Sequence, residues 1–170
     1  MRRPAPKLDL DGLWQYALRA LSGRALSIGE IKAKLSERAR RDADVVQTLA
    51  KLKEYGMIDD RRLADTYAAA RLENQGFGRA RVVQDLRRRR VAPSLAEEAV
   101  SRAYQGTDET AMVEAFLARK YRKVDLATHF GDPRKLAAAY RRLRLAGFSG
   151  SVSIRVLRRY AESAGALEEE

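Results

Sequence analysis

The sequence predicts an all-α protein built as an elongated, curved array of three tandem three-helix repeats, each similar to a helix-turn-helix unit. Apolar residues recur at helical spacing almost throughout the 170 residues, and no stretch shows the sustained alternation of a half-buried strand. Three blocks of about 50 residues share one pattern of apolar positions and differ mainly in loop length. Units of this size bury little apolar surface alone, so we expect each to stack on its neighbours.

The pattern divides the chain into five segments. We predict a basic N-terminal arm over residues 1–12, repeats over 13–58, 59–106 and 107–161, and an acidic C-terminal tail over 162–170. The first helices of the three repeats end on Arg24, Arg71 and Arg119, which are 47 and 48 residues apart. The second helices align through apolar pairs four residues apart: Ile31 with Leu35, Val82 with Leu86, and Leu136 with Tyr140.

Capping residues mark the starts of helices in the first two repeats. Ser27 with Glu30, and Ser94 with Glu97, have the spacing of a capping box. The pair Asp59-Asp60 places a carboxylate at or near the N-cap of the first helix of the second repeat. A paired Asp can also serve metal or acid–base chemistry, but no cluster of His and carboxylates surrounds this one, so we expect capping.

The ends of other helices are marked by proline and glycine. Asp132-Pro133 is typical of an N-cap followed by the proline that helices favour in their first turn. Gly56 and Gly147 follow apolar-periodic segments and are expected to end them. The loop before Asp132 is expected to contain His129, the chain's single histidine, as a surface or structural residue.

The net charge of +11 points to an anionic partner. Residues 1–75 carry 15 basic and 11 acidic groups, residues 76–160 carry 19 and 8, and the last ten residues carry 0 and 4. Of the 34 basic residues 26 are Arg, whose planar guanidinium suits paired contacts to phosphate or carboxylate, although a coding bias explains that ratio equally well. We expect nucleic acid or an acidic protein surface as the partner.

The second helices of the second and third repeats carry their cations opposite the predicted core side. On a helical wheel Val82, Val83 and Leu86 face inward in one, and Leu136, Ala139, Tyr140 and Leu143 in the other. One such face is usually only solvated, but two at the same place in the repeat favour a binding strip. The candidate DNA- or protein-binding residues are Arg79, Arg81, Gln84, Arg87, Arg88, Arg134, Lys135, Arg141 and Arg142, with Lys34 from the nearly neutral first repeat.

Composition excludes most catalytic chemistry. The chain has no cysteine and one histidine, so thiolate sites, disulfides and histidine clusters are ruled out, and we expect no cofactor, no metal site and no enzymatic activity. Asp9 and Asp11 stand where a secretory signal would need an apolar region, and no run of 18 apolar residues occurs. We therefore expect a cytoplasmic protein without a membrane segment.

One long stretch resembles a known family. Residues 59–71, DDRRLADTYAAAR, followed by residues 76–87, GFGRARVVQDLR, look like the central signature of the RecX regulatory proteins. Upstream, residues 17–24 with Ser27 and residues 30–35 resemble that family's first repeat. Two positions depart from the pattern: Ala25 stands where Pro is common, and Arg90 stands where a Gly often ends the second helix of the central repeat.

The resemblance implies a regulator rather than an enzyme. Proteins of this family are understood to bind the RecA–DNA filament and to modulate, mostly inhibit, its ATPase, strand-exchange and co-protease activities in DNA repair and the SOS response. It implies a RecA recombinase filament as partner, with single-stranded DNA and, as a further candidate, double-stranded DNA. Because repeat stacking gives no reason to expect a larger assembly, we expect a monomer, and we expect no small-molecule substrate.

Two other functions remain open on the sequence. A stand-alone helix-turn-helix-like protein would bind DNA without a recombinase, with a steep salt dependence. A helical-repeat scaffold for an acidic partner would show no affinity for nucleic acid. The acidic tail could also fold back on the basic strip and weaken non-specific binding.

Overall fold

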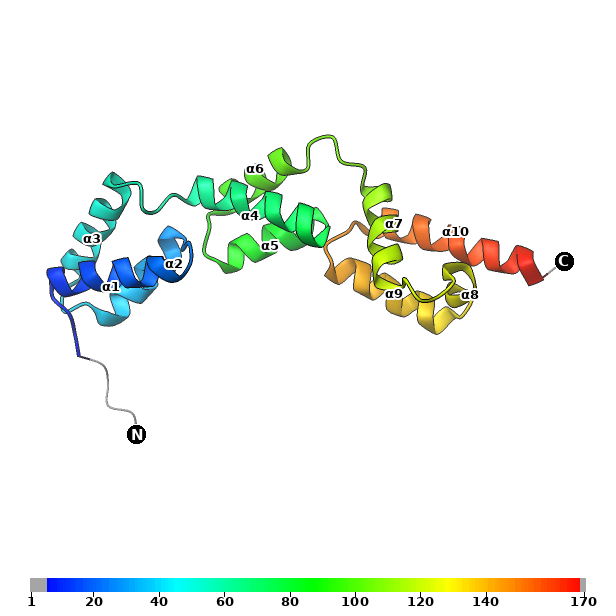
Figure 1. The fold of residues 1–170 in the computed structure, drawn as a ribbon, viewed down its shortest axis with the longest axis horizontal. Helices are drawn as coiled ribbons and strands as arrows, with labels where there is room; N and C mark the ends of the chain where they lie inside the picture. Colours follow the sequence, from blue (N-terminus) through cyan, green and yellow to red (C-terminus); the bar gives the residue numbers. More distant parts are fainter. Residues whose placement is uncertain (1–5, 169–170) are drawn as a thin grey trace. The chain divides into compact units, whose positions relative to one another are not determined.

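The chain folds into α-helices joined by short connections, as a computed structural model shows for residues 6–168 (Figure 1). Within these residues the helices are α1 (Leu10–Gly23), α2 (Ile28–Arg38), α3 (Asp42–Glu54), α4 (Asp60–Gln75), α5 (Arg79–Arg88), α6 (Pro93–Ala103), α7 (Glu109–Lys120), α8 (Leu126–Phe130), α9 (Pro133–Leu145) and α10 (Gly150–Glu168). Residues 6–168 contain no β-strand, and one isolated β-bridge pairs Leu8 with Ala39. The prediction of an all-α protein is confirmed.

Three predicted helix starts have the expected caps. Ser27 and Glu30 form a capping box at α2, each side chain accepting the other's backbone N–H at 2.9 Å. The side chain of Asp59 accepts a backbone N–H three residues later at 3.0 Å and so caps α4. Asp132 caps α9 by accepting a backbone N–H two residues later at 2.8 Å, with Pro133 as the first helical residue. These side chains satisfy N–H groups that have no partner inside a helix.

The capping box predicted at Ser94 is wrong. Helix α6 begins at Pro93, so Ser94 lies inside the first turn and not at the N-cap. Proline suits the first helical position because it lacks the N–H that would be unpaired there and because its φ is already helical. The first backbone bond of the helix runs accordingly from Ala96 N–H to Ala92 C=O, at 3.0 Å.

The segment that holds His129 is helical rather than a loop. The short helix α8 is capped by Asp125, whose side chain accepts the Thr128 backbone N–H at 2.8 Å. That hydrogen bond lowers the pKa of Asp125. Phe130 ends the helix and is 1% exposed, packed edge-on against Tyr121 with ring centroids 5.3 Å apart. Burial of this ring explains why a helical turn forms where sequence periodicity is too short to indicate one.

The helix ends differ from the predicted arm and tail. Helix α1 begins at Leu10, and Leu8 donates to the Arg38 carbonyl at 2.7 Å, so this part of the predicted arm lies against the end of α2. Helix α10 continues to Glu168 and includes residues 162–168 of the predicted tail. Residues 1–5 of the arm and 169–170 of the tail lie outside the described residues.

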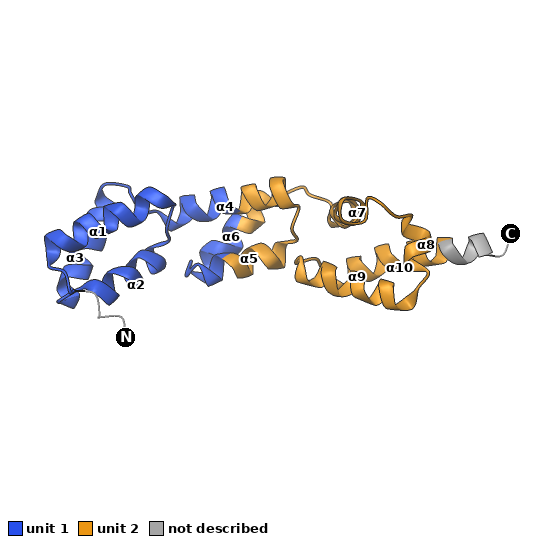
Figure 2. Ribbon diagram, turned by 60° about the horizontal axis from the view of Figure 1, so that its bottom comes forward, with its two compact units in different colours: residues 1–67, 86–99 blue, residues 68–85, 100–170 orange. Residues whose placement is uncertain are grey.

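The chain divides into two compact units, residues 1–67 with 86–99 and residues 68–85 with 100–170 (Figure 2). In the first unit a core forms around Leu13, Ile31, Leu35 and Leu52, each fully buried. In the second unit a core forms around Val113, Leu117, Leu143 and Phe148, also fully buried. The division passes through α4, α5 and α6, so each unit contains one junction between consecutive predicted repeats.

Candidate nucleic-acid and protein interface

Helix α9 presents the clearest cationic face. Ala139 and Leu143 are fully buried on its inner side, as predicted. Arg134, Lys135 and Arg141 are exposed, and among the described residues no hydrogen bond or ion pair engages their side chains. A guanidinium without an internal partner keeps its donors available to an anion. These three side chains therefore meet the requirement for a polyanion contact.

Arg142, predicted to be part of the same face, has an internal partner. It is exposed, but its guanidinium donates to the Tyr121 hydroxyl at 3.1 Å and lies 5.5 Å from the centre of that ring. These contacts attach the end of α7 to α9 and occupy part of the hydrogen-bonding capacity of the Arg142 guanidinium.

Arg81 of α5 is held inside the second unit rather than turned outward. It pairs with Asp85 at 3.1 Å, donates to the Leu145 carbonyl at 3.2 Å and lies 5.3 Å from the Phe77 ring centre. Its side chain is 35% exposed. Because Asp85 balances its charge, Arg81 contributes less to the outward potential than the helical wheel predicts.

Arg79 also has a structural role. Its guanidinium donates to the Tyr104 carbonyl at 2.9 Å and lies 5.7 Å from the Tyr104 ring centre. Tyr104 is 1% exposed and its hydroxyl donates to the Phe77 carbonyl at 2.6 Å. Burial raises the pKa of Tyr104 to about 12, against the opposing influence of the Arg79 charge. The phenol therefore stays protonated and keeps donating this hydrogen bond.

The other candidates on α5 are solvent-facing. Gln84, Arg87 and Arg88 are all exposed. No hydrogen bond or ion pair of the described residues engages the Arg87 side chain. The outward charge of this helix is therefore concentrated toward its C-terminal end.

In the second unit α9 and α5 meet end to end through two glycines. Gly78 N–H donates to the Ala146 carbonyl at 2.8 Å, and Ala80 N–H donates to the Gly147 carbonyl at 3.2 Å. A Cβ atom on Gly78 would lie 2.3 Å from the Gly147 backbone, and Gly147 has a φ of 93°. The carbonyls of the two residues that follow α9 thus accept from Gly78, just before α5, and from Ala80 in its first turn, whose N–H groups have no partner inside α5.

In the first unit the end of α5 contacts the start of α2 through an ion-pair cluster. Glu30 accepts from Arg24 at 3.0 Å and from Arg89 at 3.1 Å, and Arg89 also donates to the Ala25 carbonyl at 2.7 Å. Burial by itself raises the pKa of Glu30, but hydrogen bonds from Arg24, Arg89 and the Ser27 backbone together lower it to about 2. Glu30 is therefore a charged residue held inside this unit by two arginines.

Arg90 completes this junction in a conformation that favours glycine. Its φ is 60°, in the left-handed region that L residues rarely adopt. A Cβ atom on Gly29 would lie 2.5 Å from the Cβ of Arg90, so the two backbones are in close contact. The departure from the family pattern noted at Arg90 therefore falls on a turn that ends α5.

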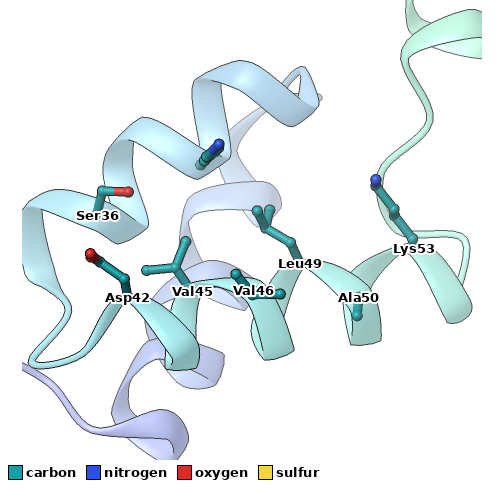
Figure 3. Close-up of a pocket in the computed structure, with 8 residues that line it drawn as sticks. Ser36, Asp42, Val45, Val46, Leu49, Ala50 and Lys53 are labelled. Carbon is teal, nitrogen blue, oxygen red and sulfur yellow. The ribbon is translucent and has the colours of Figure 1, made fainter.

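Lys34 is exposed on α2 but does not line the hollow between α2 and α3. Figure 3 shows that hollow. The hollow has a volume of about 620 Å³ and is lined by Lys32, Ser36, Asp42, Val45, Val46, Leu49, Ala50 and Lys53. In Figure 3 Ser36 and Asp42 lie at one end and Lys53 at the other. Because a carboxylate and two amines share its rim, this hollow has no single charge preference.

Helix α10 carries three arginines that are not among the residues predicted from the sequence to bind. Arg155 donates to the Thr110 hydroxyl at 3.0 Å, and Arg159 forms an ion pair with Glu114. Arg158 is exposed, and no hydrogen bond or ion pair of the described residues engages its side chain. Their spacing of three and four residues on one helix was the available signal.

Two further findings concern the described residues alone. In residues 6–168 no group of three or more His, Asp or Glu side chains is placed to hold a metal ion. None of the helices in this range has the length and apolarity needed to cross a membrane.

Comparison with known proteins identifies the family. A family model described as RecX, second three-helix domain, matches residues 59–100, from the predicted start of the second repeat. The chain is 32% identical to the regulatory protein RecX of Deinococcus radiodurans over 162 residues, which cover 95% of this chain and 74% of that protein. The chain belongs to the RecX family.

Further RecX relatives agree in sequence and fold. The regulatory protein RecX of Trichlorobacter lovleyi is 30% identical over 132 residues, covering 78% of this chain and 80% of that one. The crystal structure of RecX from Lactobacillus salivarius superimposes with a TM-score of 0.66 at 18% identity, covering 89% of this chain and 96% of that chain. A second crystal structure, of a regulatory protein RecX, gives 0.68 at 22% identity, covering 86% and 72%. The fold is therefore that of the RecX proteins.

Proposed function

We propose that this chain binds the RecA–DNA filament and modulates, mostly inhibits, its ATPase, strand-exchange and co-protease activities. Membership of the RecX family, whose curated relatives are named regulatory proteins, carries the proposal. On this reading the chain acts as a monomer, catalyses no reaction and works in the cytoplasm, where RecA filaments form on DNA.

The charge distribution supports an electrostatic component of this binding. Arg134, Lys135, Arg141 and Arg87 are exposed and have no ion pair within the described residues. Each cation that neutralises a phosphate releases a condensed counterion, which favours binding at low salt. These side chains attract the filament, whereas Arg79, Arg81 and Arg89 hold their own unit together through the contacts described above.

The two junctions between consecutive helices, at Gly78 with Gly147 and at Glu30, supply a second, steric component of filament binding. Backbone contact at Gly78 and Gly147, and the Glu30 cluster in the other unit, hold consecutive helices at fixed positions within each unit. A partner surface bound by several such helices loses freedom to move. Restriction of filament movements that accompany turnover lowers ATP hydrolysis without any chemistry on the inhibitor.

The test is ATP hydrolysis by the RecA protein of the same organism on single-stranded DNA, with this protein titrated in. Binding of the protein alone to the same DNA is recorded in parallel. We expect hydrolysis to fall at protein concentrations that leave bare DNA almost unoccupied. Unchanged hydrolysis despite tight, salt-sensitive DNA binding would contradict the proposal and favour an independent DNA-binding protein.

A further inference from the structure

An apolar groove runs between α9 and α10 in the second unit. Its volume is about 270 Å³ and its lining is formed by Pro133, Leu136, Ala137, Tyr140, Ile154 and Leu157, with Arg158 at the edge. Ile154 is 41% exposed although it is a large aliphatic residue. Exposed apolar surface that lines a concave site is characteristic of a binding surface rather than of ordinary solvent contact.

Unpaired cations flank the groove on both helices. Arg134 and Arg141 lie three residues before and four residues after Ala137 on α9, which places them next to it on the helix surface. Arg158 adjoins Ile154 on α10 at the same spacing of four residues. All three are exposed, and no ion pair of the described residues involves them.

This combination distinguishes a protein ligand from nucleic acid. The lining side chains are apolar except for the Tyr140 hydroxyl and Arg158, so a phosphate inside the groove would lose its hydration with few donors in return. Tyr140 is its only aromatic lining residue, and its ring packs against the core of the unit rather than standing free for base stacking. An apolar side chain gains from entering the groove, and carboxylates beside it gain from the arginines.

We propose that the groove binds an acidic, amphipathic segment of a protein partner. One apolar side chain of that segment occupies the space between α9 and α10, and its carboxylates pair with Arg134, Arg141 and Arg158. This inference rests on the proposed function and deepens it, because it assigns the protein surface of the filament, rather than its DNA, to this face of the chain.

The test compares two groove variants with a matched control, all made in the 170-residue chain. Ile154→Gln removes the exposed apolar contact without changing charge, and Ala137→Trp fills the groove. Met57→Gln is the control, because Met57 is 42% exposed and lies on a turn of the other unit. Binding of each labelled protein to RecA filaments on single-stranded DNA and to bare single-stranded DNA is measured, with helical content checked by circular dichroism.

We expect Ile154→Gln and Ala137→Trp to weaken filament binding by about five- to tenfold, the scale of one apolar side chain leaving a protein contact. Met57→Gln leaves filament binding within about twofold, and all three variants bind bare DNA like the wild type. Arg158→Gln weakens filament binding by about threefold, in a salt-dependent manner.

Three results would overturn the inference, and they separate it from the proposed function. If wild-type protein binds filaments and both groove variants bind them equally well, the groove is not the contact, while the proposed function stands. If the groove variants lose affinity for bare DNA to the same extent, the groove faces nucleic acid. If wild-type protein binds DNA but shows no added affinity for filaments, both the proposed function and this inference fail.

Discussion

Replacing Gly78 with alanine tests the end-to-end contact of α9 and α5. The added Cβ atom would lie 2.3 Å from the carbonyl carbon and oxygen of Gly147 and 2.5 Å from the backbone nitrogen of Phe148. All three contacts are to backbone, so no flexible side chain can move aside to make room. The two helix ends must separate, and the bonds from Gly78 to Ala146 and from Ala80 to Gly147 lengthen or break.

The cost follows from the contacts that are lost. Each backbone hydrogen bond contributes about 1 kcal/mol net, and relieving a steric overlap in packed structure costs about 1–3 kcal/mol. Gly78→Ala should therefore lower the free energy of unfolding by about 3–5 kcal/mol. The matched control is Gly23→Ala at the end of α1, where the added Cβ atom meets nothing within 4 Å. There we expect a gain of about 0.5–1 kcal/mol, because alanine loses less backbone entropy than glycine in a helix.

Urea denaturation followed by circular dichroism measures both variants, and inhibition of RecA ATPase measures the functional consequence. We expect Gly78→Ala to unfold at lower urea and to inhibit less, because α9 and the start of α5 are no longer aligned. If the free energy of unfolding of Gly78→Ala lies within about 0.5 kcal/mol of the wild-type value, the close backbone contact between Gly78 and Gly147 does not exist.

Three further predictions use other sites. Glu30→Gln should lower the free energy of unfolding by about 1–2 kcal/mol at pH 7, a value reduced for partial solvent screening. Because folding lowers the pKa of Glu30 to about 2, the difference in free energy of unfolding between this variant and the wild type should shrink as pH falls from about 4.5 to about 2. Urea titration at each pH measures this difference. Arg90→Gly should raise the free energy of unfolding by about 1 kcal/mol, because glycine adopts a φ of 60° without strain; an unchanged or lower urea midpoint would contradict this. The change Arg87→Glu should weaken binding to single-stranded DNA and reduce the slope of log affinity against log salt by about 0.7, as measured by fluorescence anisotropy; an unchanged slope would show that Arg87 does not meet phosphate.

The helical core was largely predictable from local pattern. Periodicity assigned seven residues of α5 and α9 to the inner side. Four of them are fully buried and three are half-buried: Val82, Leu86, Ala139 and Leu143, and Val83, Leu136 and Tyr140, respectively. Helix starts at Ser27, Asp59 and Asp132 were predictable because a cap bonds to backbone two or three residues away. The failure at Ser94 has a local cause as well, since the preceding proline begins the helix one residue earlier.

The candidate site was predictable only in part. Exposure of Arg134, Lys135 and Arg141 followed from the wheel, because a residue opposite a buried stripe faces solvent. The same wheel placed Arg81 outward, but its partner at the Leu145 carbonyl lies 64 residues away in sequence. No periodicity indicates such a contact.

By itself the sequence determined the helical class, the repeat, the buried face of each helix and the excess of positive charge, since these depend on residue type and on spacings of three to four residues. The tertiary structure decided which cations remain free. Arg89 meets Glu30 across 59 residues of chain, and Arg79 meets Tyr104 across 25. An arginine has the same charge whether it faces solvent or is bonded within the fold. A carboxylate or carbonyl within hydrogen-bond distance gives it a structural role, and only the packing of distant segments supplies that partner.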